Sequence, residues 1–338
     1  MCNVSVITVL KRRHKKVQEN LNSLANQTLS DVEIICVYKE ENSEINMCVQ
    51  ELRKKHGDRI KVIHKTKAQD VVAKNKALEE AQGKYILVTD GNTCYEKTAL
   101  EKMYNLAEEK NADLAVCGYS IINIDSNQTI TNGLENAFKD VEEIDGTNKA
   151  LAYLNIDSGN KLIKKEKIGN IVFQNYDDCQ DEIFILSLYA NLNTAVFIDE
   201  ELFYAYRQIA NAQRLVNPIQ IKDFQKGLTE VKKIYKDAGK YEKMKNVLSL
   251  IAFSKVGVKQ LVEISFDKSV NMKEKIREHM NYLDINFFEW RKNKFLGFTN
   301  VPRKVYWIAG LLYKFGFQSP FINIYRNLLE KTDVKLIF

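Results

Sequence analysis

Short apolar runs alternate with helical patterns along the first half of the chain. Runs of this length, separated by amphipathic stretches, are typical of βαβ units, in which a helix connects two parallel strands. The pattern predicts an α/β fold with a mainly parallel sheet flanked by helices. The expected strands are Val4–Leu10, Val32–Val37, Ile60–His64, Tyr85–Thr89 and Leu114–Gly118.

Three stretches between these strands have the spacing of helices with one apolar face. A fourth helix is expected after the strand that begins at Tyr85, because Thr93-x-x-Glu96 has the form of a capping box. The apolar positions are Val17, Leu21, Leu24 and Ala25 in the first stretch, Ile45, Cys48, Val49 and Leu52 in the second, and Ala73, Ala77 and Ala81 in the third.

The pattern changes beyond Pro218, where apolar residues recur with a helical period. Phe224, Leu228, Val231 and Tyr235 would share one face of a long helix. We therefore expect two parts. Residues 1–210 would form the α/β domain, and residues 211–338 would form a helical C-terminal region with a basic, aromatic tail.

Composition places the chain among soluble globular proteins, with 45% hydrophobic and 28% charged residues. The six cysteines are scattered and include no C-x-x-C pair, so neither a zinc site nor a disulfide framework is indicated. The apolar run Val4–Leu10 is too short for the core of a signal peptide, and its cations follow it. These features favour a cytoplasmic protein.

The positive net charge of +6 is concentrated at the C-terminal end. Residues 291–338 contain nine lysines or arginines and two acidic residues, a balance of +7. Within this tail, Arg303–Phe317 is rich in aromatic and aliphatic residues, but it is shorter than the ~20 residues that span a bilayer. One interpretation is a helix that lies on an anionic membrane surface. The alternatives are a helix buried in the C-terminal bundle and a contact between subunits.

Nucleic acid is a further candidate partner for this tail, because single-strand binders also interleave aromatic residues with cations. The long apolar stretch favours lipid or protein instead, so we expect no nucleic-acid binding.

A candidate site follows the strand that begins at Tyr85, where the sequence reads Asp90-Gly91-Asn92. Open α/β folds bind ligands at the carboxyl edge of the sheet. Asp90 is therefore a candidate for metal or diphosphate binding, and the neutral oxygen of Asn92 is a weaker ligand for a hard cation. The alternative for Asp90 is a carboxylate at a strand end that accepts backbone N–H bonds. The alternative for Asn92 is a turn residue.

The order of several short motifs resembles the family 2 glycosyltransferases, which have the Rossmann-like GT-A fold and use nucleotide sugars. The resemblance covers about residues 3–208. The motifs are Val4-Ser5-Val6-Ile7, Leu21-x-x-Leu24-x-x-Gln27-Thr28, Val32-Glu33-Ile34-Ile35, Ala73-Lys74-Asn75-Lys76-Ala77-Leu78, Ala81-x-Gly83-x-Tyr85-Ile86, Asn160-Lys161-Leu162, Asp181-x-x-Phe184 and Tyr204-x-Tyr206-Arg207-Gln208.

The resemblance implies roles for individual residues. Asp181 matches the catalytic base that deprotonates the acceptor hydroxyl; an acid favoured by a helix N-terminus is the alternative. Asp90 and Asn92 match the ends of the metal-binding D-x-D motif, which implies a weakened site for Mg²⁺ or Mn²⁺. The donor-side candidates are Thr8, Tyr38, Lys39, Lys74, Asp90 and Arg207, and the acceptor-side candidates are Asn160, Lys161 and Gln180.

The sequence departs from the family pattern around the nucleotide base. The first strand ends in Thr8-Val9-Leu10-Lys11, and the second ends in Tyr38-Lys39, where the family has paired acids. Tyr38 could stack on a base and Lys39 could meet a phosphate, or both could be solvated residues at a strand end. None of the four histidines is assigned a catalytic role.

Two functional hypotheses remain. The first is a bacterial, inverting glycosyltransferase that moves a sugar from a nucleoside diphosphate donor, most simply a UDP-sugar, to a cell-surface glycan or a lipid-linked acceptor. It would work on the inner face of the plasma membrane, as a monomer or as part of a homo- or hetero-oligomer. The alternative is a catalytically weak or inactive relative that binds a glycan or supports a partner enzyme.

Overall fold

The structure is a computed structural model, and it describes residues 2–11, 14–65, 70–133, 142–144, 158–176, 179–208, 218–297 and 304–331. Contacts between Cα atoms divide the chain into two compact units. The first contains the sheet and the helices packed on it. The second contains the helices from Pro218 onwards, together with short segments around Ile144 and Tyr176. The predicted boundary at residues 210 and 211 lies outside the described residues.

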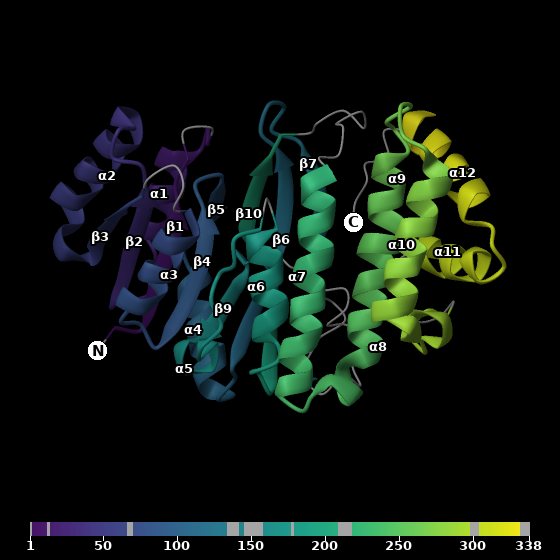
Figure 1. Ribbon diagram of the computed structural model, residues 1–338. Helices are drawn as coiled ribbons and strands as arrows, with labels where there is room; N and C mark the ends of the chain where they lie inside the picture. Colours follow the sequence, from purple (N-terminus) through teal and green to yellow (C-terminus); the bar gives the residue numbers. More distant parts are fainter. Residues whose placement is uncertain are drawn as a thin grey trace. The chain divides into compact units, whose positions relative to one another are not determined.

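Ten strands in the described part of the chain form one sheet (Figure 1). The main path runs in the order β3-β2-β1-β4-β9-β6-β10-β5, with β7 paired to β6 and β8 paired to β10. The strands are β1 (Val4–Val9), β2 (Val32–Tyr38), β3 (Ile60–His64), β4 (Tyr85–Asp90), β5 (Thr93–Tyr95), β6 (Leu114–Asn123), β7 (Thr129–Gly133), β8 (Glu142–Glu143), β9 (Lys161–Lys164) and β10 (Thr194–Arg207).

The sheet is mixed. Strands β3, β2, β1 and β4 are parallel neighbours, and β6 is parallel to β10. Strand β9 lies between these two groups and runs antiparallel to both β4 and β6. The predicted α/β fold is confirmed, and all five expected strands are present. The antiparallel insertion was not predicted, because the pattern of apolar runs does not reveal which strands become neighbours.

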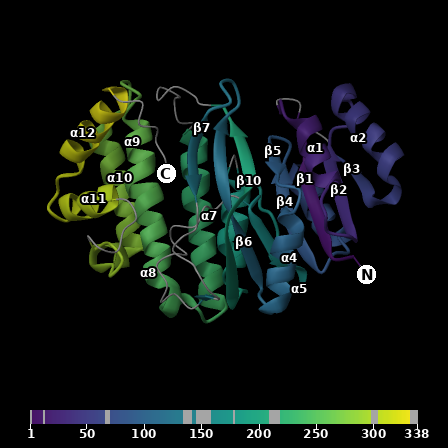
Figure 2. The same ribbon diagram turned by 180° about the vertical axis from the view of Figure 1, so that it is seen from behind.

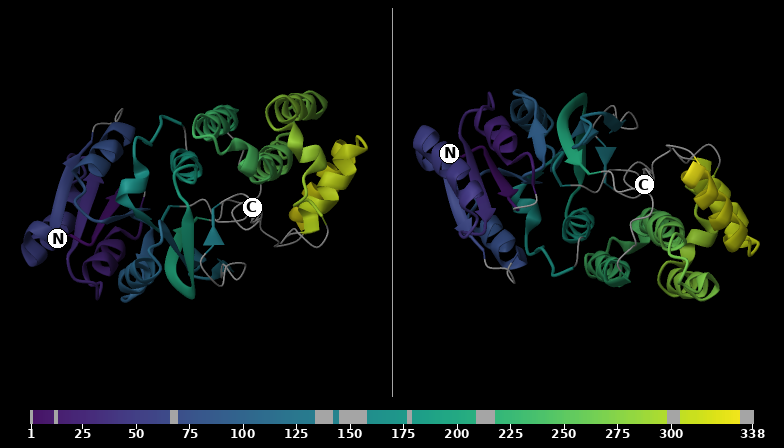
Figure 3. Two further views of the ribbon diagram at one scale, coloured as in Figure 1. Left: turned by 90° about the horizontal axis from the view of Figure 1, so that it is seen from below. Right: turned by 90° about the horizontal axis from the view of Figure 1, so that it is seen from above.

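Helices lie on both faces of the sheet (Figure 3). The apolar residues of α1, α2 and α4 share one core with alternate residues of the strands, and α3 contacts β1, β2 and β3. The predicted capping box is wrong: Thr93 begins strand β5, which pairs with β10, and α4 starts only at Ala99. The helices of this unit are α1 (Val17–Ala25), α2 (Ser43–His56), η1 (Gly57–Arg59), α3 (Asp70–Glu80), α4 (Ala99–Glu109), α5 (Lys165–Ile168) and α6 (Gln180–Leu188).

The second unit is helical (Figure 2). Its first helix buries the apolar face predicted from Phe224 to Tyr235. No helix among the described residues is both long enough and apolar enough to cross a membrane. The elements are α7 (Pro218–Asp237), α8 (Tyr241–Ala252), the π-helix η3 (Phe253–Gln260), α9 (Leu261–Ile264), α10 (Met272–Asn286), the 3-10 helix η4 (Phe288–Lys292), α11 (Lys304–Lys314) and α12 (Gln318–Lys331).

A buried carboxylate ties the parallel strands together near their amino ends. Glu33 on β2 accepts hydrogen bonds from the Ser5 hydroxyl and from the Gln82 N–H (2.5 Å), and it pairs with Lys61 on β3 (2.6 Å). Burial alone would raise the pKa of Glu33, but these hydrogen bonds outweigh it and lower the pKa below its ordinary value. The carboxylate therefore stabilises the fold in its charged form.

We expect Glu33→Gln to lower the free energy of unfolding by about 1–3 kcal/mol at neutral pH, because it removes the charged acceptor of a buried network. Since the folded-state pKa is lowered, this stabilisation is present above the ordinary carboxylate pKa and is lost as pH falls through the folded-state value. Urea unfolding should therefore show the variant and the wild type converging in acid. The exposed Glu109→Gln is the control and should cost little; a constant difference at all pH values would contradict this account.

Candidate functional site

The parallel register brings the carboxyl ends of four strands to one edge. Val9 on β1 lies opposite Asp90 on β4 and opposite Val37 on β2. Tyr38 at the end of β2 lies opposite His64 at the end of β3. The residues that end or follow these strands therefore gather along this edge, and they include Lys11, Lys39, Lys65 and Asp90.

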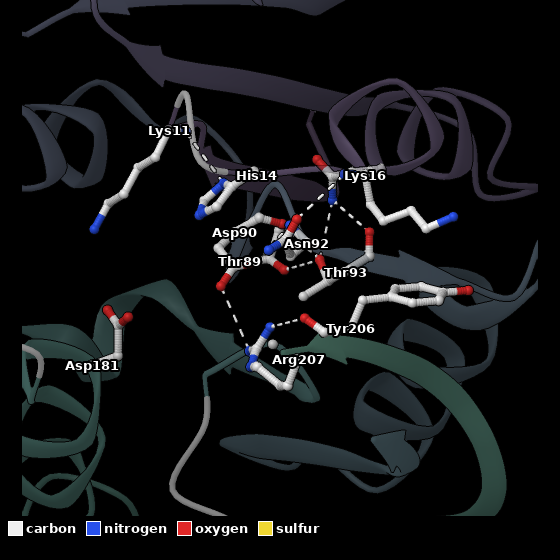
Figure 4. Close-up of polar contacts among 12 residues, drawn as sticks. Lys11, His14, Lys16, Thr89, Asp90, Asn92, Thr93, Asp181, Tyr206 and Arg207 are labelled. Atoms are coloured by element: carbon white, nitrogen blue, oxygen red, sulfur yellow. Dashed lines mark hydrogen bonds and ion pairs between the residues drawn. The ribbon is translucent and has the colours of Figure 1, made fainter. Parts of the chain in front are cut away.

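Asp90 is held in place and remains accessible. Its Oδ1 accepts the N–H of Asn92 at 2.7 Å, and its Oδ2 lies 3.6 Å from Nη2 of Arg207. Its side chain is 36% exposed. In the view of Figure 4, His14 and Arg207 lie on opposite sides of Asp90. The structure thus brings together two predicted donor-side residues, Asp90 and Arg207.

Asn92 fastens the turn after β4 to its surroundings. Its side-chain oxygen accepts the backbone N–H groups of Lys15 (2.8 Å) and Lys16 (3.3 Å), where α1 begins (Figure 4). Its backbone carbonyl accepts the N–H of Tyr206 on β10 at 2.8 Å. Because an amide oxygen has two lone pairs, both are already engaged. A metal ion at Asn92 would have to displace one of these N–H groups.

Gly91 is required by close packing at this turn. A Cβ atom at this position would lie 2.7 Å from Nδ1 of His14 and 3.1 Å from the Leu10 side chain. Nδ1 of His14 also accepts the backbone N–H of Lys11 at 3.2 Å. His14, which sequence reasoning left without a role, therefore shapes the segment that faces Asp90.

A buried polar network supports the edge from within the fold. The Thr8 hydroxyl donates to Oδ1 of Asn20 at 3.0 Å, and the Asn20 amide donates to the carbonyl and the hydroxyl of Thr93 at 3.0 and 3.1 Å. The Thr93 hydroxyl also lies 2.7 Å from that of Thr89. Thr8 is fully buried, and its hydroxyl is engaged in this network. Contact between Thr8 and a nucleotide sugar would therefore require the side chain to rearrange.

Tyr38 and Lys39 end the second strand in different environments. Tyr38 is fully buried, its hydroxyl donates to Asn46 at 2.9 Å, and its ring packs edge-on against His64 at 5.0 Å. Stacking on a nucleotide base would require this ring to leave its packing. Lys39 is half-buried at the carboxyl edge, where a phosphate contact is geometrically simpler.

Lys74 joins the donor-side and acceptor-side candidates. Its Nζ donates to Oδ1 of Asp181 at 2.8 Å and to Oε1 of Gln180 at 3.3 Å, and it lies 4.8 Å from the centre of the Phe173 ring. Lys74 is buried and Asp181 is 45% exposed, so the carboxylate remains accessible beside a desolvated cation. Asn75 holds this arrangement through two hydrogen bonds to the Phe173 backbone, at 2.8 and 3.0 Å.

A second cluster of charged residues at the edge was missed from the sequence. Lys65 follows β3, is only 2% exposed at its side chain, and pairs with Asp70 at 2.8 Å; Lys11 lies 3.6 Å from the same carboxylate. Burial lowers the pKa of Lys65 despite this partner. Burial alone would raise the pKa of Asp70, but Lys65 and Lys11 outweigh it and lower that pKa. The position of Lys65 directly after a parallel strand was the signal that could have identified it.

The acceptor-side candidates Asn160 and Lys161 are both fully buried at the start of β9. The Asn160 amide donates to the Cys117 carbonyl at 2.9 Å, and Lys161 donates to the Asn160 side chain at 2.8 Å. The bond to Cys117 attaches the start of β9 to β6. Of the three predicted acceptor-side residues, only Gln180 shares a hydrogen-bond donor with Asp181. Both side chains accept a hydrogen bond from Nζ of Lys74.

The described residues offer a limited set of ligands for a metal ion. They contain no group of three histidine, cysteine or acidic side chains that could hold one. Asp90 provides one accessible carboxylate. One carboxylate can suffice for Mg²⁺ when substrate phosphates supply further oxygens. The residues present therefore fit a cation held largely by a bound diphosphate, and Arg207 would compete for the same carboxylate.

The sequence of residues 5–171 matches the model for Glycosyl transferase family 2. TuaG of Bacillus subtilis, assigned as a teichuronic acid biosynthesis glycosyltransferase, is 25% identical over 258 residues, which cover 76% of this chain and 96% of TuaG. EpsH of Bacillus subtilis, assigned as a glycosyltransferase, is 27% identical over 137 residues. That match covers 40% of this chain and 39% of EpsH, so it spans less than half of this relative.

The fold is also similar to that of a solved structure. S. aureus TarS 1-349 in complex with UDP-GlcNAc superposes with a TM-score of 0.70 at 15% sequence identity, over 96% of this chain and 92% of that chain. Identity at this level shows a shared fold. The likeness confirms the predicted GT-A architecture, including the helical C-terminal region.

We expect Asn92→Ala to lower the free energy of unfolding by about 0.5–2 kcal/mol, because it leaves two N–H groups at the start of α1 without an acceptor. Asn92→Asp should retain or raise stability, since a carboxylate accepts the same bonds and favours a helix N-terminus. Urea unfolding measures both. The control Asn22→Ala, at an exposed position within α1, should cost nothing; equal stability of Asn92→Ala and wild type would refute the capping role.

Proposed function

Because the chain belongs to glycosyl transferase family 2, we propose that it transfers a sugar from a nucleoside diphosphate donor to an acceptor hydroxyl, with Asp181 as the base. The observation that carries this proposal is the contact between Lys74 and Asp181. It joins an accessible carboxylate to the cation-rich edge of the sheet. Direct displacement at an anomeric carbon needs a general base close to the site that binds the diphosphate leaving group.

The charges at the edge support an anionic donor. Four cations lie within ion-pair distance of an acid: Lys11 and Lys65 of Asp70, Lys74 of Asp181, and Arg207 of Asp90. Asp70 and Asp181 lie in the first turns of α3 and α6, and Asp90 ends β4. A diphosphate would give these cations further anionic partners. The related fold of TarS was solved with UDP-GlcNAc, which makes a UDP-sugar the first donor to test.

In the proposed reaction, Asp181 accepts the proton of the acceptor hydroxyl as its oxygen bonds to the anomeric carbon. The bond from that carbon to the diphosphate oxygen breaks with its electron pair, and attack from the opposite face inverts the configuration. Lys74 can turn from Asp181 toward the developing charge on the diphosphate, since its ammonium group has three donors. This exchange would leave Asp181 available to the hydroxyl.

Asp90 is the residue that would hold Mg²⁺ or Mn²⁺ together with the diphosphate, with Asn92 as a weaker oxygen nearby. When bound, such a cation stabilises negative charge on the leaving group. Arg207 lies close enough to Asp90 to stabilise the same charge directly. Its guanidinium can form two parallel hydrogen bonds to phosphate oxygens.

The acceptor in this proposal is a cell-surface glycan or a lipid-linked precursor of one. TuaG is assigned to the synthesis of such a polymer, and it aligns with this chain over nearly its whole length. We place the reaction in a bacterial cytoplasm at the inner face of the plasma membrane. Subunit partners are compatible with this role.

A catalytically weak relative is the second candidate function. The buried ring of Tyr38 and the engaged oxygen of Asn92 both favour it, because two donor-side residues are used by the fold. Such a protein would bind a glycan or support a partner enzyme. Transfer assays with a panel of UDP-, GDP- and CDP-sugars, with Mn²⁺ and after chelation, separate the two functions.

Asp181→Asn is expected to reduce kcat by about 10²–10⁴-fold, the usual contribution of general-base catalysis. The amide retains the size of the side chain but cannot accept the proton. Glu182→Gln, the same change at the next residue of α6, should retain most activity and is the control. Full activity of Asp181→Asn would exclude Asp181 as the base.

Lys74→Met is expected to raise the KM for the donor by about 10- to 100-fold, because one charge-assisted hydrogen bond to the diphosphate is lost. Lys74→Arg should retain donor binding, since it keeps the charge and adds a planar fork. Lys76→Met, on the exposed side of the same helix, is the matched control. Melting temperatures check that the buried variants fold. An unchanged KM in folded Lys74→Met would remove Lys74 from donor binding.

A further inference from the structure

Exposed apolar side chains are concentrated in the last two described helices and the turn between them. Among the described residues, eleven large hydrophobic side chains are exposed, and six of them lie between residues 308 and 328. Scattered exposed hydrophobic residues are normal on a soluble protein, whereas a concentration of them marks an interaction surface. The six are Ile308, Leu311, Phe315, Phe317, Ile324 and Leu328.

The opposite faces of these helices are anchored in the second unit. The Tyr313 hydroxyl donates to the carbonyl of Gly257 in η3 at 3.0 Å, and Gly310 of α11 packs against Leu296. Helix α12 contacts α9 and α10. Each helix therefore has a buried inner face and an exposed outer face. The buried residues are Tyr306, Ala309, Gly310 and Tyr313 in α11, and Phe321, Ile322 and Leu329 in α12.

Two exposed phenylalanines lie where α11 turns into α12, and Phe315 is the most exposed large hydrophobic residue in the described part of the chain. Phe315 is 71% exposed and Phe317 is 52% exposed. Gly316 between them has a φ of +82°, a conformation that glycine adopts without strain, and it allows the abrupt turn. Ile308, Leu311 and Phe315 follow one another at helical spacing, so the stripe on α11 leads directly to this turn. We call residues 311–317 the α11–α12 tip.

The charges around the tip favour an anionic partner. Helix α11 contains no acidic residue and has exposed lysines at both ends, Lys304 and Lys314. The acid of α12 is Glu330, which lies 3.9 Å from Arg326. The exposed apolar surface is therefore bordered by cations that outnumber acids.

A lipid surface suits this combination better than a second copy of the chain. A symmetric dimer through the tip would bring the lysines of one copy against those of the other, which is unfavourable without intervening acids. Anionic headgroups would pair with the lysines, and the acyl region would accept the phenylalanines. Short helices with one anchored face suit a surface contact, and neither is long enough to span a bilayer.

We propose that the α11–α12 tip inserts Phe315 and Phe317 into an anionic membrane surface while Lys304 and Lys314 pair with lipid headgroups. This inference deepens the proposed function, because it names the surface that would bring the chain to a lipid-linked acceptor. It is argued from the tip itself, and it can be tested without donor or acceptor.

The experiment is co-sedimentation of the full chain with phosphatidylcholine vesicles, with and without phosphatidylglycerol, at low and high salt. The wild type should bind anionic vesicles, and high salt should weaken binding. The double variant Phe315→Ser/Phe317→Ser should lose about tenfold or more of its partitioning, and Lys314→Glu should lose several-fold. Phe288→Ser removes a phenylalanine outside the tip that is 56% exposed, and this variant should bind as wild type does.

Three outcomes would overturn the proposal. They are absence of wild-type binding to anionic vesicles, equal loss in Phe288→Ser and the double variant, and a dimer in lipid-free ultracentrifugation that the double variant abolishes while vesicle binding is retained. Transfer to a soluble acceptor is measured in parallel. Because the tip lies outside the catalytic residues, the double variant should retain that activity, so failure of membrane binding is distinguishable from failure of the proposed reaction.

Discussion

The candidate site depends on one constraint, the register of four parallel strands, which brings their carboxyl ends to the same edge of the sheet. Because Val9 pairs with both Val37 and Asp90, the ends of β1, β2 and β4 reach the same edge, and β3 joins them through Tyr38 and His64. A shift of one residue in any strand would turn its side chains to the other face. The Glu33 network near the amino ends and the Thr8 network near the carboxyl ends both hold this register.

Much of the fold was accessible from the sequence, because burial of parallel strands leaves continuous apolar runs. The five expected strands and the buried faces of α1 and α2 follow from the apolar pattern, although β6 continues to Asn123, beyond its expected end at Gly118. The failures share one cause: a short local signal was overridden by pairing with a distant segment. Thr93 has the spacing of a capping box but pairs with β10, and β9 enters the sheet antiparallel between β4 and β6.

The same reasoning explains why the candidate site was predicted only in part. Motif position named Asp90, Lys74, Asp181 and Arg207 as candidates, and the structure brings them into contact as two pairs. The use of Asn92 as an acceptor for the start of α1, and the sharing of Asp70 by Lys11 and Lys65, depend on contacts between residues far apart in sequence. Spacing alone cannot report such contacts.

The paired charges at the edge also explain how a cation-rich site can persist without an anionic ligand. Asp70, Asp90 and Asp181 each form an ion pair with a cationic side chain. The buried ammonium group of Lys74 therefore has a compensating charge, the carboxylate of Asp181, in the resting protein. A diphosphate would compete with these carboxylates for the same cations. Under the proposed function, donor binding and the release of Asp181 are then one event, because Lys74 cannot hold both partners equally well. An acceptor hydroxyl would meet a carboxylate without its ammonium partner only after the donor has arrived, which disfavours proton transfer without a sugar to move.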